Sequence, residues 1–163
     1  MESMFEGCKN FKGIGLDNWN PIKCKDMHNM FHGCKKFNCN LKNWNVSNVI
    51  DMNSMFEGCN NFKGSGLEDW KPINCENFNA IFRDCYNFDN NLGNWNIRDV
   101  EYIYGMFWMF ENCKKFKGIG LEKWKPTIKC KKKMGGLFNG CTSLIKYPKW
   151  YNPSKDYHYN YKI

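Results

Sequence analysis

The sequence predicts an α/β repeat solenoid that is leucine-rich-repeat-like, with short parallel strands on one face and short helices on the other. Three observations lead to this fold class. A phrase of the type Met-Phe-x-Gly-Cys recurs six times, a Leu-x-x-Trp phrase keeps step with it, and an apolar stripe at helical spacing runs through each period. We expect a single solenoid of five to six repeats of about 26 residues over 1–150, then a tyrosine-rich cap or tail over 151–163.

The cysteines and tryptophans define the repeat. Successive cysteines of the first phrase are 26, 25, 26, 28 and 28 residues apart. A unit of this length cannot build a core alone, so each repeat must bury its apolar residues against its neighbours. The cysteines are Cys8, Cys34, Cys59, Cys85, Cys113 and Cys141; the tryptophans are Trp19, Trp44, Trp70, Trp95 and Trp124, with Trp150 as a weaker sixth.

Each repeat divides into a predicted strand and a predicted helix. Residues 41–46 carry Leu, Trp and Val at the positions expected to face the core of a short strand. Residues 52–59 carry apolar residues at i, i+3, i+4 and i+7, the stripe of a helix of two to three turns. The spacing from Ile103 to Cys113 is three residues longer than in other repeats, which predicts a longer helix there.

Two kinds of repeat alternate along the chain. The repeats that begin at Phe11, Phe62 and Phe116 carry a Gly-x-Gly-Leu phrase, whereas those at Phe37 and Phe88 carry asparagine in its place. Glycine tolerates a positive φ that other residues avoid, so the paired glycines predict such a conformation before every second Leu-x-x-Trp phrase.

The residues on either side of each tryptophan form the predicted binding surface. They lie between the core positions of the predicted strands and face solvent. Acids and lysines balance on this face and asparagine is abundant, which favours hydrogen bonding to a protein partner. The candidate residues are Asn18, Asn20, Asn43, Asn45, Asp69, Lys71, Asn94, Asn96, Lys123 and Lys125.

A lysine-rich segment supplies an alternative function. The net charge is +8, and residues 114–133 hold nine lysines with the single acid Glu122. Such a patch can bind nucleic acid or an anionic surface. Against this alternative, the segment contains no arginine, and its aromatic residues Phe116 and Trp124 belong to the core pattern.

The residues predict no catalytic site, metal site or cofactor. Six of the ten cysteines form one column, and Cys24, Cys75 and Cys130 occupy positions that valine fills in other repeats, so we expect mainly buried free thiols. No Cys-x-x-Cys pair is present, which makes the zinc signal weak. His28 and His32 lie off the apolar stripe and are expected to be exposed to solvent. The chain is therefore predicted not to be an enzyme.

Residues 43–62, which read NWNVSNVIDMNSMFEGCNNF, resemble the BspA-like 26-residue repeat of bacterial surface proteins. The resemblance covers nearly all of residues 1–150. It implies a leucine-rich-repeat-like solenoid with a role in adhesion or protein binding, and it implies no catalytic residues.

The two ends of the chain carry further expectations. The pattern begins within a repeat, which leaves an N-terminal edge through which two copies could associate end to end. The sequence contains no apolar run long enough to span a membrane. Residues 1–5 lack the basic and apolar segments of a signal peptide, so an intracellular location is favoured.

The predicted register is tested by comparing Trp70→Ala with Asn45→Ala. Loss of a large core aromatic should lower the free energy of unfolding by about 3–5 kcal/mol, whereas the exposed asparagine should contribute almost nothing. Thermal or urea unfolding of both variants measures the difference. Small and equal effects would show that the inward and outward positions have been assigned wrongly.

Overall fold

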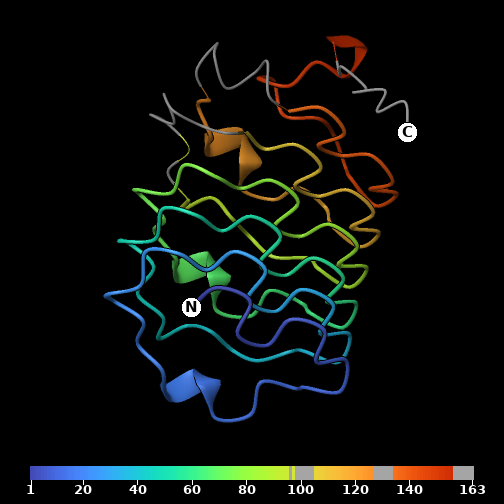
Figure 1. The fold of residues 1–163 in the computed structure, drawn as a ribbon. Coiled ribbons are helices and arrows are strands. Elements are labelled where there is room, and N and C mark those ends of the chain that lie inside the picture. Colours follow the sequence, from blue (N-terminus) through green and yellow to red (C-terminus); the bar gives the residue numbers. More distant parts are fainter. Residues whose placement is uncertain (96, 98–104, 127–133, 156–163) are drawn as a thin grey trace, which may run out of the picture.

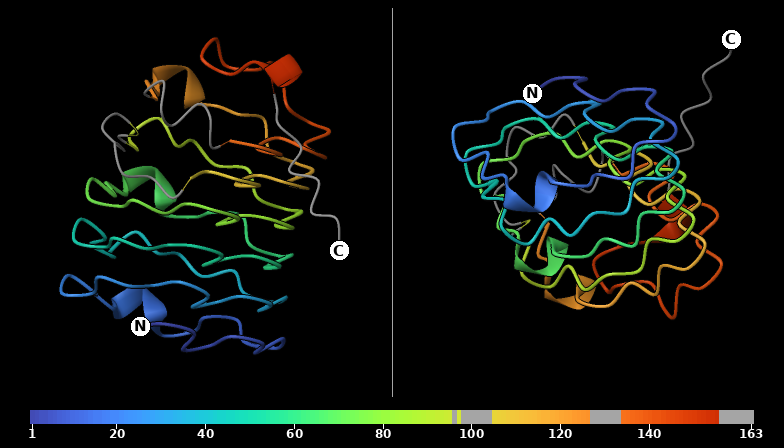
Figure 2. Two further views of the ribbon diagram at one scale, coloured as in Figure 1. Left: turned by 45° about the horizontal axis from the view of Figure 1, so that its top comes forward. Right: turned by 90° about the horizontal axis from the view of Figure 1, so that it is seen from below.

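The protein is a stack of coils that follow one another in the order of the sequence (Figure 1). The computed structural model describes residues 1–95, 97, 105–126 and 134–155. Each coil is one repeat, and the side view in Figure 2 shows successive coils lying on one another from the first to the last. Among the residues described, no helix is long and apolar enough to cross a membrane.

The predicted α/β repeat solenoid is wrong. Within the described residues, the regular elements are four 3-10 helices of three residues each, and α-helices and β-strands are absent. Isolated parallel bridges join successive coils, from Asp26 to Asp51, from Asp51 to Asn77 and from Asn77 to Gly105. The 3-10 helices are η1 (Leu16–Asn18), η2 (Leu67–Asp69), η3 (Leu121–Lys123) and η4 (Pro153–Lys155).

Consecutive turns replace the predicted helices. Asn29 and Gly33 have φ values of 54° and 72°, a left-handed conformation through which an α-helix cannot continue. The N–H of Met30 donates to the carbonyl of Met27 at 3.2 Å, which closes one turn, and a second turn closes in the same way at Cys34. Turns of four residues place apolar side chains at i, i+3, i+4 and i+7, so they produce the stripe that predicts a helix.

Backbone hydrogen bonds between coils take the place of a sheet. Along the Met-Phe segments, every second N–H donates to a carbonyl of the next coil, from Ser3 in the first coil to the carbonyl of Asn139 in the last. The N–H of Phe31 donates to Met55 at 2.9 Å, and the N–H of Phe56 donates to Ile81 at 3.0 Å. The remaining N–H groups close the turns, so the buried backbone is satisfied. All backbone-to-backbone bonds between these segments run in one direction, from the N–H of each coil to a carbonyl of the next.

Single turns also replace the predicted strands. The N–H of Trp44 donates to the carbonyl of Leu41 at 3.0 Å, which makes the Leu-x-x-Trp phrase a tight turn. In alternate coils this turn is a 3-10 helix preceded by a glycine with φ of 90°, as in Gly66 before η2. The positive φ predicted for the paired glycines is therefore confirmed.

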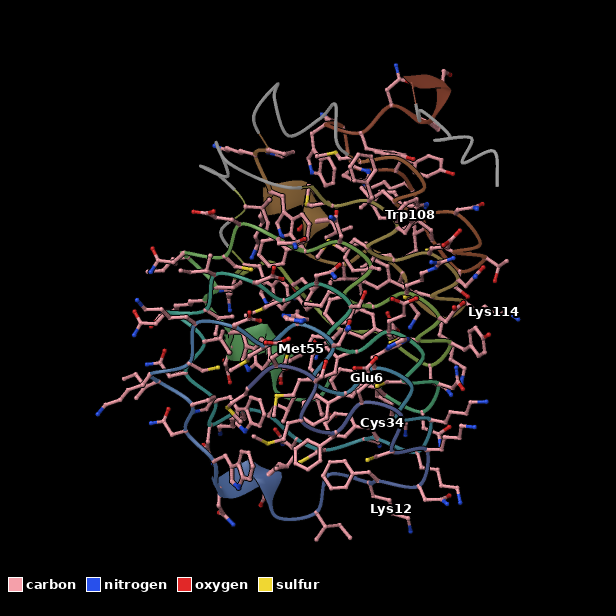
Figure 3. All side chains as sticks on the ribbon, in the orientation of Figure 1. Glu6, Lys12, Cys34, Met55, Trp108 and Lys114 are labelled. Carbon is pink, nitrogen blue, oxygen red and sulfur yellow. The ribbon has the colours of Figure 1, made fainter. Side chains whose placement is uncertain are left out.

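The core consists of stacked aromatic columns that run through all coils. Phe31 and Phe56 have ring centroids 5.6 Å apart, and Trp44 and Trp70 have centroids 6.4 Å apart, with each pair nearly parallel. Trp44, Trp70, Trp95 and Trp124 are at most 3% exposed, so the inward position predicted for the tryptophans is confirmed for these four. Trp19 in the first coil is 37% exposed and Trp150 is half-buried. Figure 3 shows these side chains filling the space within the coils.

The longer helix and the cap were predicted near the last coils. In the described part of the longer segment, residues 105–113, turns continue and a helix is absent; Ile103 itself lies outside the described residues. At the C-terminal end, Tyr147 and Tyr151 pack on Phe138 with ring centroids 5.9 and 4.9 Å away. Residues 156–163 of the predicted tail lie outside the described residues.

The close approach of coils at Gly66 can be tested by substitution. A Cβ at this glycine would collide with the backbone nitrogen of Lys42, whereas a Cβ at Gly7, which also has positive φ, meets nothing within 4 Å. Gly66→Ala should therefore cost about 2–5 kcal/mol and Gly7→Ala about 1–2 kcal/mol in urea unfolding. Equal costs would mean that the coils do not meet at Gly66.

Candidate functional site

The candidate binding residues lie on the turns that carry the tryptophans. They occupy the positions directly before and after each tryptophan, and we call this surface the tryptophan-turn face. Asn96 lies outside the described residues. The other nine are exposed, as expected, although they lie on turns and 3-10 helices rather than on strands.

Indole hydrogen bonds hold the tryptophan-turn face in register. The Nε1–H of Trp44 donates to the carbonyl of Leu16 at 2.7 Å, and the Nε1–H of Trp70 donates to Leu41 at 3.0 Å. The same bond recurs at Trp95, Trp124 and Trp150 with lengths of 2.8, 2.9 and 2.7 Å. Each tryptophan is therefore fixed to the coil before it, and the polar residues beside it are presented on a rigid base.

Three of the candidate asparagines also make structural hydrogen bonds. The amide of Asn43 donates to the carbonyl of Asp17 at 3.0 Å, and the amide of Asn94 donates to the carbonyl of Glu68 at 2.9 Å. Each of these bonds joins one coil to the coil before it. The Oδ1 of Asn45 accepts the N–H of Ser47 at 3.0 Å. Six of the described candidates have side chains with no hydrogen bond to another described residue: Asn18, Asn20, Asp69, Lys71, Lys123 and Lys125.

The cysteine column has a structural role. The thiol of Cys34 donates to the carbonyl of Phe5 at 2.9 Å, and the thiol of Cys85 donates to Phe56 at 2.9 Å. Burial raises the pKa of Cys34 to about 11 and the pKa of Cys85 well above its usual range. Reactive cysteines and metal-ligating cysteines have lowered pKa values, so this environment suits neither role.

The prediction of buried free thiols is confirmed for most of the described cysteines. The exceptions are Cys8, which is exposed in the first coil, and Cys24 and Cys141, which are half-buried. Cys130 lies outside the described residues.

His28 and His32 are half-buried, so the prediction that these two histidines are exposed to solvent is wrong. The Nδ1 of His28 lies 2.7 Å from Asp26, and its Nε2 lies 3.2 Å from Glu2. Partial burial lowers the pKa of His28, but the hydrogen bond and charge of Asp26 outweigh it and raise this pKa overall. Glu2, Asp26 and His28 are close enough to hold a metal ion. Both ring nitrogens already face carboxylates, however, so the group is explained as an ion-pair cluster.

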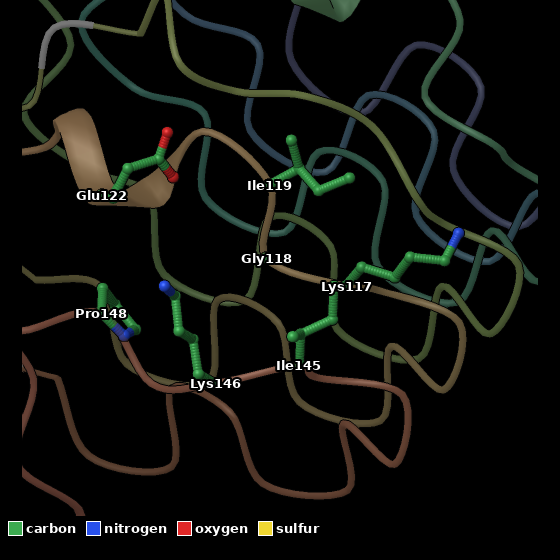
Figure 4. A pocket seen from close by; sticks show the side chains of 7 residues that line it. All are labelled: Lys117, Gly118, Ile119, Glu122, Ile145, Lys146 and Pro148. Carbon is green, nitrogen blue, oxygen red and sulfur yellow. The ribbon is translucent and has the colours of Figure 1, made fainter.

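An open hollow lies between the last two coils, near the lysine-rich segment (Figure 4). It is lined by Lys117, Ile119, Glu122, Ile145, Lys146 and neighbouring backbone. Lys117 forms an ion pair with Asp89 at 2.5 Å. The remaining charged residues that line the hollow are Lys146 and Glu122. The hollow brings together no nucleophile with a general base, so it offers no machinery for a reaction.

The structure divides the lysine-rich segment between two surfaces. Lys114, Lys115 and Lys117 lie on the turn after Cys113, whereas Lys123 and Lys125 flank Trp124 on the tryptophan-turn face. Lys129 and Lys131–Lys133 lie outside the described residues. Sequence analysis missed a different arrangement, in which lysines occupy the first, second or fourth position after Cys8, Cys34, Cys59 and Cys113, although not after Cys85 or Cys141. Aligning the repeats on their cysteines reveals these lysines in the sequence.

The buried thiols predict a loss of stability in alkaline solution. As pH rises above the ordinary thiol value of 9.0, Cys85 ionises in the unfolded chain but stays protonated in the folded chain. The free energy of unfolding therefore falls with pH, and Cys85→Ser should remove about 1.4 kcal/mol per pH unit of that slope. Urea unfolding between pH 8 and pH 11 measures it. Cys8→Ser, at an exposed position of the same column, is the control, and identical slopes for both variants would contradict the prediction.

Comparison with known proteins places the chain in a family. The model of the family described as "Mycoplasma protein of unknown function, DUF285" matches residues 1–124. Neither the search of curated proteins nor the search of solved structures found a match. Because this match covers about three quarters of the chain, the chain belongs to the DUF285 family, which is described as mycoplasma protein of unknown function.

Proposed function

We propose that the protein is a non-enzymatic repeat scaffold that binds a protein partner through the tryptophan-turn face. The observation that supports this proposal most directly is the row of exposed polar side chains on both sides of the buried tryptophan column. The row continues from one coil to the next because each indole is bonded to the preceding coil.

The chemistry of this face suits a protein surface. Asp69, Lys71, Lys123 and Lys125 mix both signs of charge, and the asparagines offer both donors and acceptors. Complementary polar groups of this kind set the specificity of a protein interface. A rigid base reduces the ordering cost that binding would otherwise carry. A polyanion would meet Asp17, Glu68, Asp69 and Glu122 on the same face and be repelled by them.

The resemblance to the BspA-like repeat supports the same function. That family of bacterial surface proteins implies adhesion or protein binding, and the DUF285 match is compatible with it. The phrases that carry the resemblance also form the turns of the tryptophan-turn face and the cysteine column, so the binding face follows from the repeat itself.

The test uses side chains that contribute nothing to the fold. The triple variant Asn20→Ala, Lys71→Ala and Lys125→Ala removes three exposed groups that follow a tryptophan and make no hydrogen bond within the described residues. Proteins captured from a cell extract by the wild-type chain are identified, and the affinity for each is measured. Loss of three polar contacts of about 0.5–1 kcal/mol each should weaken binding about tenfold or more.

The matched control is Asn10→Ala, Lys36→Ala and Lys115→Ala, which removes the same residue types from exposed positions on the turns after the cysteines. This variant should bind the partner as the wild type does. Equal weakening by both variants, or no weakening by the first, would contradict the proposed face. Unfolding midpoints of both variants establish that the stack is intact.

A further inference from the structure

A second surface runs along the turns that follow the cysteines, and it is independent of the tryptophan-turn face. We call it the lysine ridge. Figure 3 shows two of its members extending outward, Lys12 at the bottom of the view and Lys114 at its right edge. All of its lysines are exposed: Lys9, Lys12, Lys35, Lys36, Lys63, Lys114, Lys115, Lys117 and Lys146.

Backbone hydrogen bonds between neighbouring coils make the ridge continuous at its N-terminal end. The N–H of Lys36 donates to the carbonyl of Lys9 at 3.2 Å, and the N–H of Asn38 donates to Lys12 at 3.3 Å. The N–H of Asn61 donates to the carbonyl of Lys35 at 3.2 Å. These bonds place the turns of the first three coils directly on one another.

The same contacts continue through the later coils. The N–H of Asp89 donates to the carbonyl of Lys63 at 3.4 Å, and the N–H of Ile145 donates to Lys117 at 3.4 Å. The hydroxyl of Thr142 donates to the carbonyl of Lys114 at 3.3 Å. With neighbouring coils about 4.8 Å apart, the six turns span roughly 24 Å. Lysines lie on five of them, whereas the turn after Cys85 carries Tyr86, Asn87 and Asp89 instead.

The ridge concentrates positive charge that the protein leaves uncompensated. Asp89 is the acid on these turns, and it pairs with Lys117 at 2.5 Å. Lys114 lies over the ring of Tyr86 at 4.9 Å. Among the described residues, the other seven lysines of the ridge have no ion-pair partner for their side chains. A linear array of free ammonium groups of this length calls for a linear polyanion.

We propose that the lysine ridge binds the phosphate backbone of duplex nucleic acid without reading its base sequence. Lysine binds phosphate as a point charge, whereas bidentate readout of guanine or of carboxylates favours arginine. The described arginine, Arg83, is occupied by Glu111 at 2.7 Å and by Glu57 at 3.6 Å. The described ridge therefore lacks an arginine that would read guanine or select the carboxylates of acidic polysaccharides, and the side chains of Asn38, Asn60 and Asn87 on its turns are engaged in hydrogen bonds within the protein.

Single-stranded nucleic acid fits this surface less well than a duplex. Proteins that bind single strands stack the bases on exposed aromatic rings. Tyr86 is the aromatic residue between the two groups of lysines, and Lys114 covers its ring. Tyr147, beside Lys146, packs on Phe138. Tyr86 and Tyr147 are 40% and 49% exposed, but each has a ring face occupied by a neighbouring side chain, whereas a duplex presents its phosphates on its outer surface without any stacking.

Salt-dependent binding by matched variants tests the proposal. The probes are two fluorescently labelled 20-base-pair duplexes of unrelated sequence, and the affinity of each is measured by anisotropy between 50 and 200 mM KCl. Wild-type protein should bind both equally. The variant Lys9→Gln, Lys12→Gln, Lys35→Gln and Lys36→Gln should bind at least tenfold more weakly, and its slope of log K against log salt should be shallower by about 2–4, since each phosphate contact contributes about 0.9.

The control variant carries Lys23→Gln, Lys25→Gln, Lys42→Gln and Lys71→Gln, which removes the same charge from exposed lysines outside the ridge. It should keep the wild-type slope and bind within about threefold of wild type. Equal losses in both variants, a preference between the two duplexes, or absence of binding at 50 mM KCl would overturn the proposal. Tighter binding of a single strand or of heparin than of the duplex would overturn it as well. Capture of a protein by the tryptophan-turn face is a separate measurement, so the failure of one proposal does not decide the other.

Discussion

The hydrogen bonds from each coil to the next determine how the rest of the chain must fold. Every second N–H of the Met-Phe segments is committed to a carbonyl of the neighbouring coil. The remaining N–H groups must then close turns, and two residues in each segment must take positive φ for the turns to alternate with the inter-coil bonds. This geometry leaves no continuous stretch for an α-helix and pairs residues singly rather than in long ladders.

Side-chain bonds also join successive coils, in the direction opposite to the backbone bonds of the Met-Phe segments. The indole of Trp70, the thiol of Cys59 and the amide of Asn43 each donate to a carbonyl of the preceding coil. A cysteine at these positions is therefore more than a small apolar residue, because its thiol satisfies a carbonyl in the core. The stacked rings contribute burial, while these donors fix the register in which the rings stack.

The sequence predicted the repeat, its length and the side chains that enter the core, since burial of Leu41, Trp70 and Cys85 follows from their spacing. It predicted the wrong backbone because turns of four residues and an α-helix place apolar side chains at the same intervals. The positive φ at Ser54 or Ala80 leaves no mark that hydrophobic periodicity can detect. The candidate binding residues were placed correctly at the surface, whereas the lysine ridge emerged only when the turns were aligned in space.

The backbone bonds between the Met-Phe segments all run from one coil to the next, which gives these segments a polarity. At the first coil, the carbonyls of Glu2, Met4 and Glu6 accept no backbone N–H from the described residues, because the equivalent carbonyls of the second coil accept theirs from the first. On the turns after the cysteines and at the tryptophans the direction is reversed, since the N–H of Lys36 donates to Lys9 and the indole of Trp44 donates to Leu16. The Met-Phe segment of the first coil therefore presents acceptors, and two such segments brought face to face would oppose oxygen to oxygen.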